Sequence, residues 1–251
     1  MKQPILEVDH VDLFYQERLA ETQAIRDLSF SVEEGEFLAI CGPSGCGKTS
    51  VLSLIMQLIE PTRGSLRLPE HLRVGYMLQR DHLLEWRTVE SNVLLGLEVK
   101  GLCTPERKAQ ASALLDRYGL AGFKKHRPAQ LSGGMRQKVA LIRTLACDPE
   151  LLLLDEPFSA LDYQTRLRLS DEIYGIIKDQ KKTAILVTHD ISEAVSMADR
   201  ILVFSERPAT LNLDLSLDFD SGEPPLMRRN DPRFSGYFNT IWKELDSHES
   251  A

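Results

Sequence analysis

The chain has 251 residues, and 43% of them are hydrophobic, so it can bury the core of one large domain or of two small ones. The formal net charge of −7 argues against a nucleic-acid-binding protein, because such proteins usually present a basic face. The sequence contains no apolar run of the roughly 18 residues that a membrane span needs, and residues 1–7 lack the apolar core of a signal peptide.

Three strands are predicted before residue 42. In the first, Leu6 and Val8 alternate with Glu7 and Asp9, which is typical of a strand with one buried face. The third is a short apolar run that leads directly into a glycine-rich segment. The strands are expected at residues 5–15, 28–32 and 37–41, with a tight turn at residues 34–36 between the last two.

The glycine-rich segment matches a phosphate-binding pattern. Residues 42–49 read G-P-S-G-C-G-K-T and fit G-x-x-x-x-G-K-[ST] at every fixed position. The glycines let backbone N–H groups turn inward around anionic oxygens, and a helix predicted at residues 50–59 points its positive end at the same phosphates. Lys48 is expected to reach the β- and γ-phosphates, and the Thr49 hydroxyl to bind Mg²⁺. The residues expected to contact the nucleotide here are Gly42, Pro43, Ser44, Gly45, Cys46, Gly47, Lys48, Thr49 and Ser50.

The middle of the chain changes from strands to helices. Short strands are predicted at residues 64–68 and 74–78, and Gln79 ends the second of them. From about residue 88 to residue 147 helical spacing dominates, as in residues 106–118. This pattern predicts a helical segment inserted into an α/β core.

A second anion-binding helix start is predicted inside the helical segment. Ser132 can cap a helix that runs to Ala146, while Gly133 and Gly134 clear space at its start. Taken alone, these residues fit an ordinary capped helix equally well. In a chain that also carries a phosphate loop, they indicate a second site for phosphate oxygens.

Polar residues follow two further apolar strands. The strand at residues 151–154 ends in Asp155 and Glu156, and the strand at residues 183–187 is followed by His189. Asp155 can hold Mg²⁺, in this interpretation through water, and Glu156 can accept a proton from the attacking water. His189 is expected near the γ-phosphate. The predicted catalytic residues are Lys48, Glu156 and His189.

The order of these motifs resembles the ATP-binding cassette (ABC) transporter family over about residues 5–205. The resemblance implies an ATPase subunit with a RecA-like P-loop NTPase fold, which uses ATP and Mg²⁺. The motifs that carry it are the phosphate loop at residues 42–49, Gln79, Leu131 to Gln137, Leu154-Asp155-Glu156-Pro157, Ser159-Ala160-Leu161-Asp162 and His189.

The resemblance also implies roles for residues around the nucleotide. Tyr15 would stack on adenine, although the long stretch at residues 16–23 leaves Phe14 open as the stacking residue. Gln79 would be a magnesium ligand, with Thr49 and Asp155, and a sensor of the transport partner.

A second copy of the chain would complete each nucleotide site. The resemblance implies that Ser132, Gly133 and Gly134 bind the γ-phosphate of ATP held by that second copy. Asp162 would cross the dimer interface, and His189 would hold the γ-phosphate and the attacking water. The expected assembly is therefore a homodimer.

The predicted organisation is one ABC ATPase domain over the whole chain. After residue 205 the sequence is rich in Pro, Asp and Ser up to residue 230, which predicts a short strand and a loosely packed connection, and residues 231–245 predict a terminal helix. The predicted parts are an α/β core with an antiparallel β subdomain at residues 1–87 and 148–205, a helical subdomain at residues 88–147 and a C-terminal extension at residues 206–251.

A narrower resemblance points to one branch of importers. Residues 83–93, 131–137 and 198–208 are similar to the nitrate/sulfonate/taurine branch, although Glu85 stands where that branch often has Pro. The resemblance implies an ATPase at the cytoplasmic face of the cell membrane. It would work with transmembrane permease subunits and, indirectly, with a solute-binding protein, and it would not bind nucleic acid. A soluble ABC ATPase that acts in assembly or nucleic-acid maintenance is the alternative.

The segment from about Gln79 to Glu98 is the predicted docking surface for the permease. Leu83, Leu84 and Trp86 form an apolar cluster just after Gln79. If the chain met no partner there, such a cluster would be expected to bury itself.

Overall fold

The computed structural model describes residues 4–16, 21–220 and 222–249, so part of the long stretch at residues 16–23 and the extreme ends of the chain lie outside the described residues. Within them, six strands form the larger sheet, which is parallel except for its last strand. In order across the sheet they are β5 (Val74–Met77), β6 (Leu151–Asp155), β7 (Thr183–Val187), β3 (Phe37–Cys41), β8 (Arg200–Phe204) and β9 (Leu211–Ser216).

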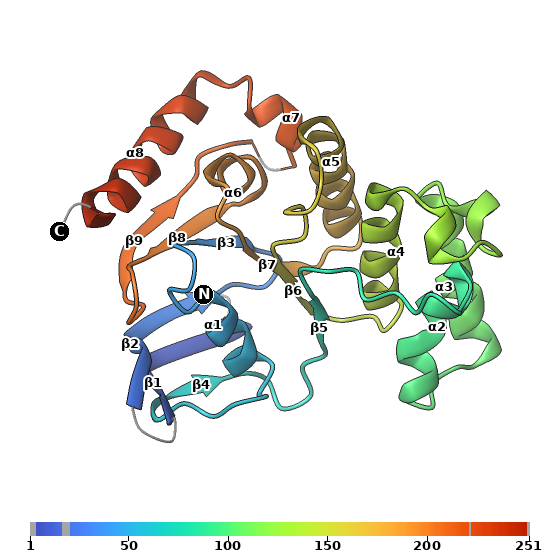
Figure 1. The fold of residues 1–251 in the computed structure, drawn as a ribbon, viewed down its shortest axis with the longest axis horizontal. Coiled ribbons are helices and arrows are strands. Elements are labelled where there is room, and N and C mark those ends of the chain that lie inside the picture. The colour runs from blue at the N-terminus through green and yellow to red at the C-terminus, as the bar shows by residue number, and fades with distance from the viewer. Residues whose placement is uncertain (1–3, 17–20, 221, 250–251) are drawn as a thin grey trace.

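A smaller antiparallel sheet packs beside the first one. In the part of the chain that the structure describes, its strands are β2 (Glu21–Val32), β1 (Leu6–Gln16) and β4 (Arg63–Arg67), in that order. Figure 1 shows this sheet and α1 (Lys48–Ile55) on one side of the larger sheet, with other helices on the opposite side. The predicted α/β fold is confirmed, and the antiparallel sheet agrees with it.

Helices cover the larger sheet and extend from one of its edges. In Figure 1, α2, α3 and α4 gather beyond β5, while α5, α6 and α8 lie over the sheet. The helices other than α1 are α2 (Val89–Val99), α3 (Pro105–Arg117), α4 (Gly133–Leu145), α5 (Tyr163–Asp179), α6 (Ile191–Met197), α7 (Pro225–Arg228) and α8 (Pro232–Glu249), with short 3-10 turns η1 (Ala121–Phe123) and η2 (Pro128–Gln130).

Buried apolar side chains explain why the central strands are so uniformly hydrophobic. Each of β3, β6 and β7 is buried along its whole length, because both faces of the sheet are covered. Leu152 and Leu154 face the core beneath α5 and α6, whereas Leu151 and Leu153 face the core beneath α1 and the smaller sheet. Side chains of β6 thus alternate between the two faces of the larger sheet, so one strand contributes to the cores on both sides.

Two predicted boundaries differ from the structure. The strand predicted at residues 28–32 is the second half of β2. Its first half also pairs with β1 but was missed, because only Ala24 and Ile25 among its residues are apolar and buried. The helix predicted to reach Ile59 ends at Ile55, since Gln57 adopts a left-handed conformation with φ 55° and the Leu58 amide turns back to the Ser53 carbonyl.

Residues 206–230 contain the predicted short strand, β9, but the prediction that the connection packs loosely is wrong at Arg228. Arg228 is only 1% exposed, and its guanidinium donates to the Ala198 carbonyl at 2.6 Å and to the Tyr174 hydroxyl at 3.1 Å. The guanidinium also lies 5.2 Å from the centre of the Phe219 ring and 3.6 Å from the Asp199 carboxylate. One long side chain therefore anchors the C-terminal extension to the core.

Replacing Arg228 by alanine is expected to lower the free energy of unfolding by about 2 kcal/mol, since it leaves the Ala198 carbonyl and the Tyr174 hydroxyl without this donor and removes a buried stem. Urea unfolding measures the change. Arg233→Ala is the matched control, because Arg233 also lies over Phe219 but its side chain is 43% exposed. If the two variants unfold at the same urea concentration, Arg228 is not the anchor.

Candidate active site

The phosphate loop lies between β3 and α1. Gly47 caps α1 with φ 127°, and a Cβ atom there would lie 2.9 Å from the Ala24 carbonyl, so only glycine fits this turn. The Lys48 ammonium donates to the carbonyls of Gly42 and Pro43, both at 2.8 Å, and the side chain is 5% exposed. The loop thus folds around the ammonium, beside the positive end of α1.

A cluster of hydroxyl and carboxylate oxygens lies next to the phosphate loop. The Thr49 hydroxyl is 3.5 Å from Asp155 Oδ2, and the Tyr76 hydroxyl donates to the same oxygen at 2.9 Å. Burial raises the pKa of Asp155, against the hydrogen bond from Tyr76, which lowers it. Hydroxyl and carboxylate oxygens are the ligand types that Mg²⁺ prefers, so the residues present fit this ion.

Tyr76 is a site residue that the sequence analysis missed. It lies in β5, and its neighbour across the ladder is Leu153, two residues before Asp155. The sequence does show a tyrosine near the carboxyl end of a predicted strand. It could be placed beside Asp155 only if the pairing of β5 with β6 were already known.

Three predicted residues meet at the carboxyl ends of the strands. The Gln79 amide donates to Glu156 Oε2 at 3.1 Å, and His189 Nδ1 lies 3.1 Å from Glu156 Oε1. Glu156 adopts a left-handed conformation with φ 44°, and its amide donates to the Val187 carbonyl at 2.8 Å. Such a backbone costs about 1–3 kcal/mol for a residue other than glycine, and such strain is frequent at functional sites.

The residues that follow His189 belong to a network of charged side chains around Arg166. Arg166 donates to Asp190 at 3.0 Å and to the Leu161 carbonyl at 3.3 Å, and its Nε lies 3.6 Å from Glu193. Glu193 is 3% exposed; burial raises its pKa to about 7, although a hydrogen bond from Thr188 opposes this. Arg166 therefore ties the segment before α5 to the segment that carries His189.

Tyr15 lies against the start of α1. Its hydroxyl donates to Ser50 Oγ at 3.0 Å, and the residue is 39% exposed. Of the two aromatic candidates, Tyr15 is the one for which the structure records a contact with the phosphate-loop helix. Phe14 is placed by its amide, which donates to the Thr62 hydroxyl at 3.0 Å.

The second predicted anion site lies apart from the phosphate loop. Ser132 caps α4 by accepting from the Met135 amide at 3.3 Å, and Asp162 caps α5 by accepting from the Thr165 amide at 3.0 Å. The side-chain and backbone hydrogen bonds with Thr165 lower the pKa of Asp162. The starts of α4 and α5 are adjacent, since a Cβ on Gly134 would lie 3.2 Å from the Thr165 side chain. In Figure 1, α4 lies across β5 and β6 from α1.

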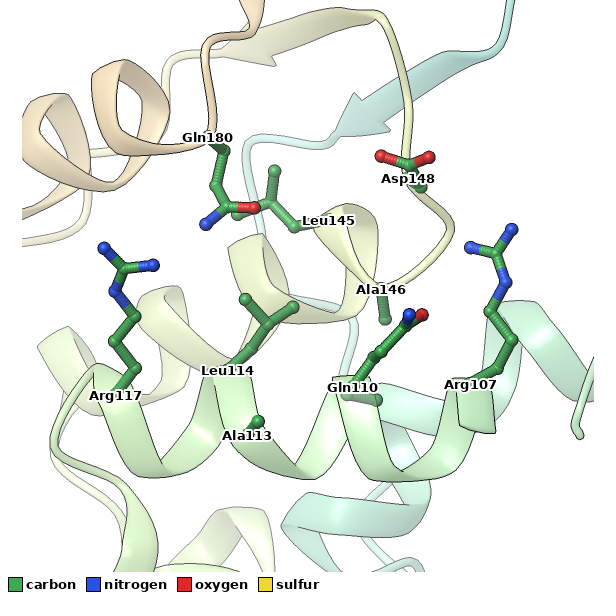
Figure 2. A pocket seen from close by; sticks show the side chains of 10 residues that line it. Arg107, Gln110, Ala113, Leu114, Arg117, Leu145, Ala146, Asp148 and Gln180 are labelled. Carbon is green, nitrogen blue, oxygen red and sulfur yellow. The ribbon is translucent and has the colours of Figure 1, made fainter. Parts of the chain in front are cut away.

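A polar pocket of about 500 Å³ lies elsewhere, between α3 and the loop that precedes β6. Figure 2 shows Arg107 and Arg117 projecting from α3 toward this pocket, with Asp148 and Gln180 across from them. Asp148 is already bound by Lys182 at 2.7 Å, and Arg117 pairs with Asp179 at 3.1 Å. Because Asp148 and Arg117 are paired locally and the lining includes no predicted site residue, we assign the pocket no chemistry.

A family model described as "ABC transporter" matches residues 25–159, which is more than half of the chain. The chain belongs to the ABC transporter family. The predicted family is therefore confirmed, and the chain is an ATP-binding subunit. Within the described residues, no helix is long and apolar enough to cross a membrane.

Relatives place this subunit more narrowly. The chain is 48% identical to the uncharacterized ABC transporter ATP-binding protein YtlC of Bacillus subtilis, over 97% of this chain and 96% of that protein. It is 43% identical to the taurine import ATP-binding protein TauB of Yersinia pestis (84% and 87% covered) and 35% identical to the nitrate import ATP-binding protein NrtD of Synechocystis (98% and 96%). The predicted nitrate/taurine branch is confirmed.

A solved structure agrees with the fold. The dimeric post-hydrolysis state of the ATP-binding cassette MJ0796, bound to ADP and phosphate, superposes with a TM-score of 0.68 at 28% identity. The match covers 85% of this chain and 99% of that one. The P-loop NTPase fold is thereby confirmed.

Proposed function

We propose that the chain is the ATP-hydrolysing subunit of an importer, in which two copies hold two ATP molecules and drive partner permease subunits. The observation that carries this proposal is the meeting of Gln79, Glu156 and His189 beside the phosphate loop. A carboxylate that can accept a proton, an imidazole that can hold the γ-phosphate and an amide converge on one point, where Glu156 contacts the other two.

The chemistry follows from the positions of these side chains. Lys48 and the loop amides bind the β- and γ-phosphates, and Tyr15 stacks on adenine, which contributes roughly 1–3 kcal/mol for stacking of this kind. Glu156 accepts a proton from the water that attacks the γ-phosphorus, while ADP leaves. His189, held 3.1 Å from Glu156, orients the same water and the γ-phosphate.

Magnesium has a place in this proposal. Thr49, Asp155 and the Gln79 amide oxygen would hold the ion, which when bound offsets phosphate charge. The Tyr76 hydroxyl fixes the orientation of the Asp155 carboxylate.

The second copy supplies the rest of each site. Within one chain, α4 lies across the sheet strands from α1 (Figure 1). Ser132 and Gly133 at the start of α4 are exposed, so they are available to another molecule. The MJ0796 cassette is a dimer in its ADP- and phosphate-bound structure. We infer that Ser132, Gly133 and Gly134 of one copy bind the γ-phosphate held by the other, and that Asp162 lies at that interface. ATP binding then closes the pair, and hydrolysis reopens it.

The segment from Gln79 to Glu98 is suited to carry the signal to a permease. Trp86 is 73% exposed, whereas Leu83 is buried, so only part of the predicted apolar cluster is exposed for contact with a partner. Arg136 of α4 donates to Asp81 at 2.7 and 3.0 Å and to Glu85 at 2.7 Å. A movement at Trp86 would therefore pass to the helix that begins at Ser132.

The names of the relatives bear on the transported solute. Relatives named for taurine import and for nitrate import support a small solute of the nitrate/sulfonate/taurine class, delivered by a solute-binding protein to the permease. The chain would sit at the cytoplasmic face of the membrane. The same names speak against the alternative, a soluble ABC ATPase in assembly or nucleic-acid maintenance.

Uptake by cells tests this function. In a strain that lacks this gene, the wild-type chain is expected to restore uptake of labelled taurine or of nitrate. Trp86→Ala is expected to restore less than about a tenth of it, because truncating an anchor residue of an interface typically costs 2 kcal/mol or more. Purified Trp86→Ala protein should bind ATP as the wild type does, which calorimetry measures.

The controls separate the parts of the proposal. Leu102→Ala removes another exposed apolar side chain, 47% exposed and outside the docking segment, and should leave uptake unchanged. Normal uptake by Trp86→Ala would refute docking through this residue. If deleting the gene affects the uptake of neither solute, the solute class is wrong.

A further inference from the structure

The C-terminal helix α8 packs on the core with one face and reaches the active site with another. Ile241 is fully buried, and Phe234, Tyr237, Phe238 and Leu245 pack partly buried against the same core. Their spacing of three and four residues makes one apolar face, which contacts α6, β8 and β9.

Trp242 lies at the border of this face. It is 54% exposed, and its ring stacks on Phe238 with 6.2 Å between ring centres and 12° between the planes. Because more than half of the indole is in solvent, the fold gains little of what burial of such a ring would contribute. Burial in the core therefore accounts for only part of the position of Trp242.

Trp242 forms part of the wall of a cavity beside the phosphate loop. Leu245 and Asp246 share that wall, and across from them lie His189, Ile191 and the loop residues at positions 42–44. The cavity has a volume of about 190 Å³, which is less than a typical small-molecule site. The carboxyl half of α8 thus flanks the same loop and histidine that face the γ-phosphate in the proposed mechanism.

We propose that the carboxyl half of α8 belongs to the interface between the two copies, and that the second copy covers Trp242 when the pair closes on ATP. This inference rests on the proposed function, in which the second copy brings its Ser132 segment onto the phosphates held by the loop. A surface that borders the loop on the His189 side then faces that copy. A half-exposed tryptophan that stacks on a second aromatic ring is of the residue type enriched at interfaces and among their anchor residues.

Tryptophan fluorescence tests the inference. The chain has two tryptophans, so Trp86→Phe leaves Trp242 as the single tryptophan, whose emission can be excited apart from that of the tyrosines. In this background, with Glu156→Gln to retain ATP, adding Mg-ATP is expected to shift the emission to shorter wavelength and to lower the acrylamide quenching constant at least about twofold. The same protein with Ser132→Arg in addition is the matched control, which binds ATP but cannot close.

Sizing of the same samples separates the outcomes. A dimer whose Trp242 remains fully quenchable would overturn the inference and leave the proposed function standing. A lack of any ATP-dependent dimer would count against the proposed function itself. If Trp242 becomes protected in the Ser132→Arg monomer as well, the cavity closes within one chain and the interface role is wrong.

A second variant measures the energetic weight of the contact. Trp242→Ala is expected to raise the protein concentration needed for half-dimerisation with ATP by about 10-fold or more, and Trp242→Phe by less, because the phenyl ring retains part of the contact. Since Trp242 is half exposed, the helix should keep its place, which the unchanged urea midpoint would show. Equal dimerisation by Trp242→Ala and the wild type would refute the proposal.

Discussion

Glu156→Gln is expected to lower ATP hydrolysis by about 10²–10⁴-fold while ATP affinity changes little. Glutamine has the shape of glutamate, so its amide oxygen can still accept from Gln79, which lies 3.1 Å from Glu156 Oε2. It cannot accept a proton from the attacking water. ATP should therefore persist in the site and hold two copies together.

Two measurements check this prediction. Phosphate release gives the rate, and sizing with Mg-ATP should show a stable dimer only for the variant. Glu172→Gln is the matched control: Glu172 is a carboxylate on α5 that is 50% exposed and pairs with Lys138, so its variant should hydrolyse ATP normally. If Glu156→Gln hydrolyses ATP at a near-normal rate, another group is the base.

Local motifs could be read from the sequence because their chemistry lies within a few residues. The phosphate loop needs glycine at position 47, where the backbone is left-handed and the Ala24 carbonyl is close. The apolar strands before Asp155 and His189 are likewise short runs that are buried on both faces. For these reasons the α/β fold, the position of Lys48 at the start of α1 and the positions of Asp155, Glu156 and His189 at strand ends followed from the pattern.

Contacts between distant segments could not be read in this way. Tyr76 meets Asp155 across 79 positions of the sequence, and Arg166 meets Asp190 across 24. Both depend on which strands pair and on where α5 lies. The buried Arg228 was also missed, because an arginine in a Pro- and Asp-rich stretch is usually exposed. Its burial is made favourable by the Ala198 carbonyl and Tyr174, which lie far from it in the sequence, and by the Phe219 ring.

Mixing two inactive variants is expected to restore ATP hydrolysis. Lys48→Ala removes the ammonium that we propose to contact the phosphates, and Ser132→Arg places a large side chain at the start of α4, so each homodimer is expected to have two defective sites. A mixed dimer combines the intact loop of one chain with the intact Ser132 segment of the other. With random exchange, about half of the dimers are mixed and each has one intact site, so about a quarter of the wild-type rate is expected if the sites act independently.

A chain that carries both substitutions provides the control. Mixed with either single variant, it gives dimers in which both loops or both Ser132 segments are defective, so no intact site forms and no activity should return. Recovery in the first mixture alone would require that Lys48 of one copy and Ser132 of the other act on the same ATP. If the first mixture stays as inactive as the control mixtures although the chains exchange, both elements are needed within a single chain, and the head-to-tail arrangement is wrong.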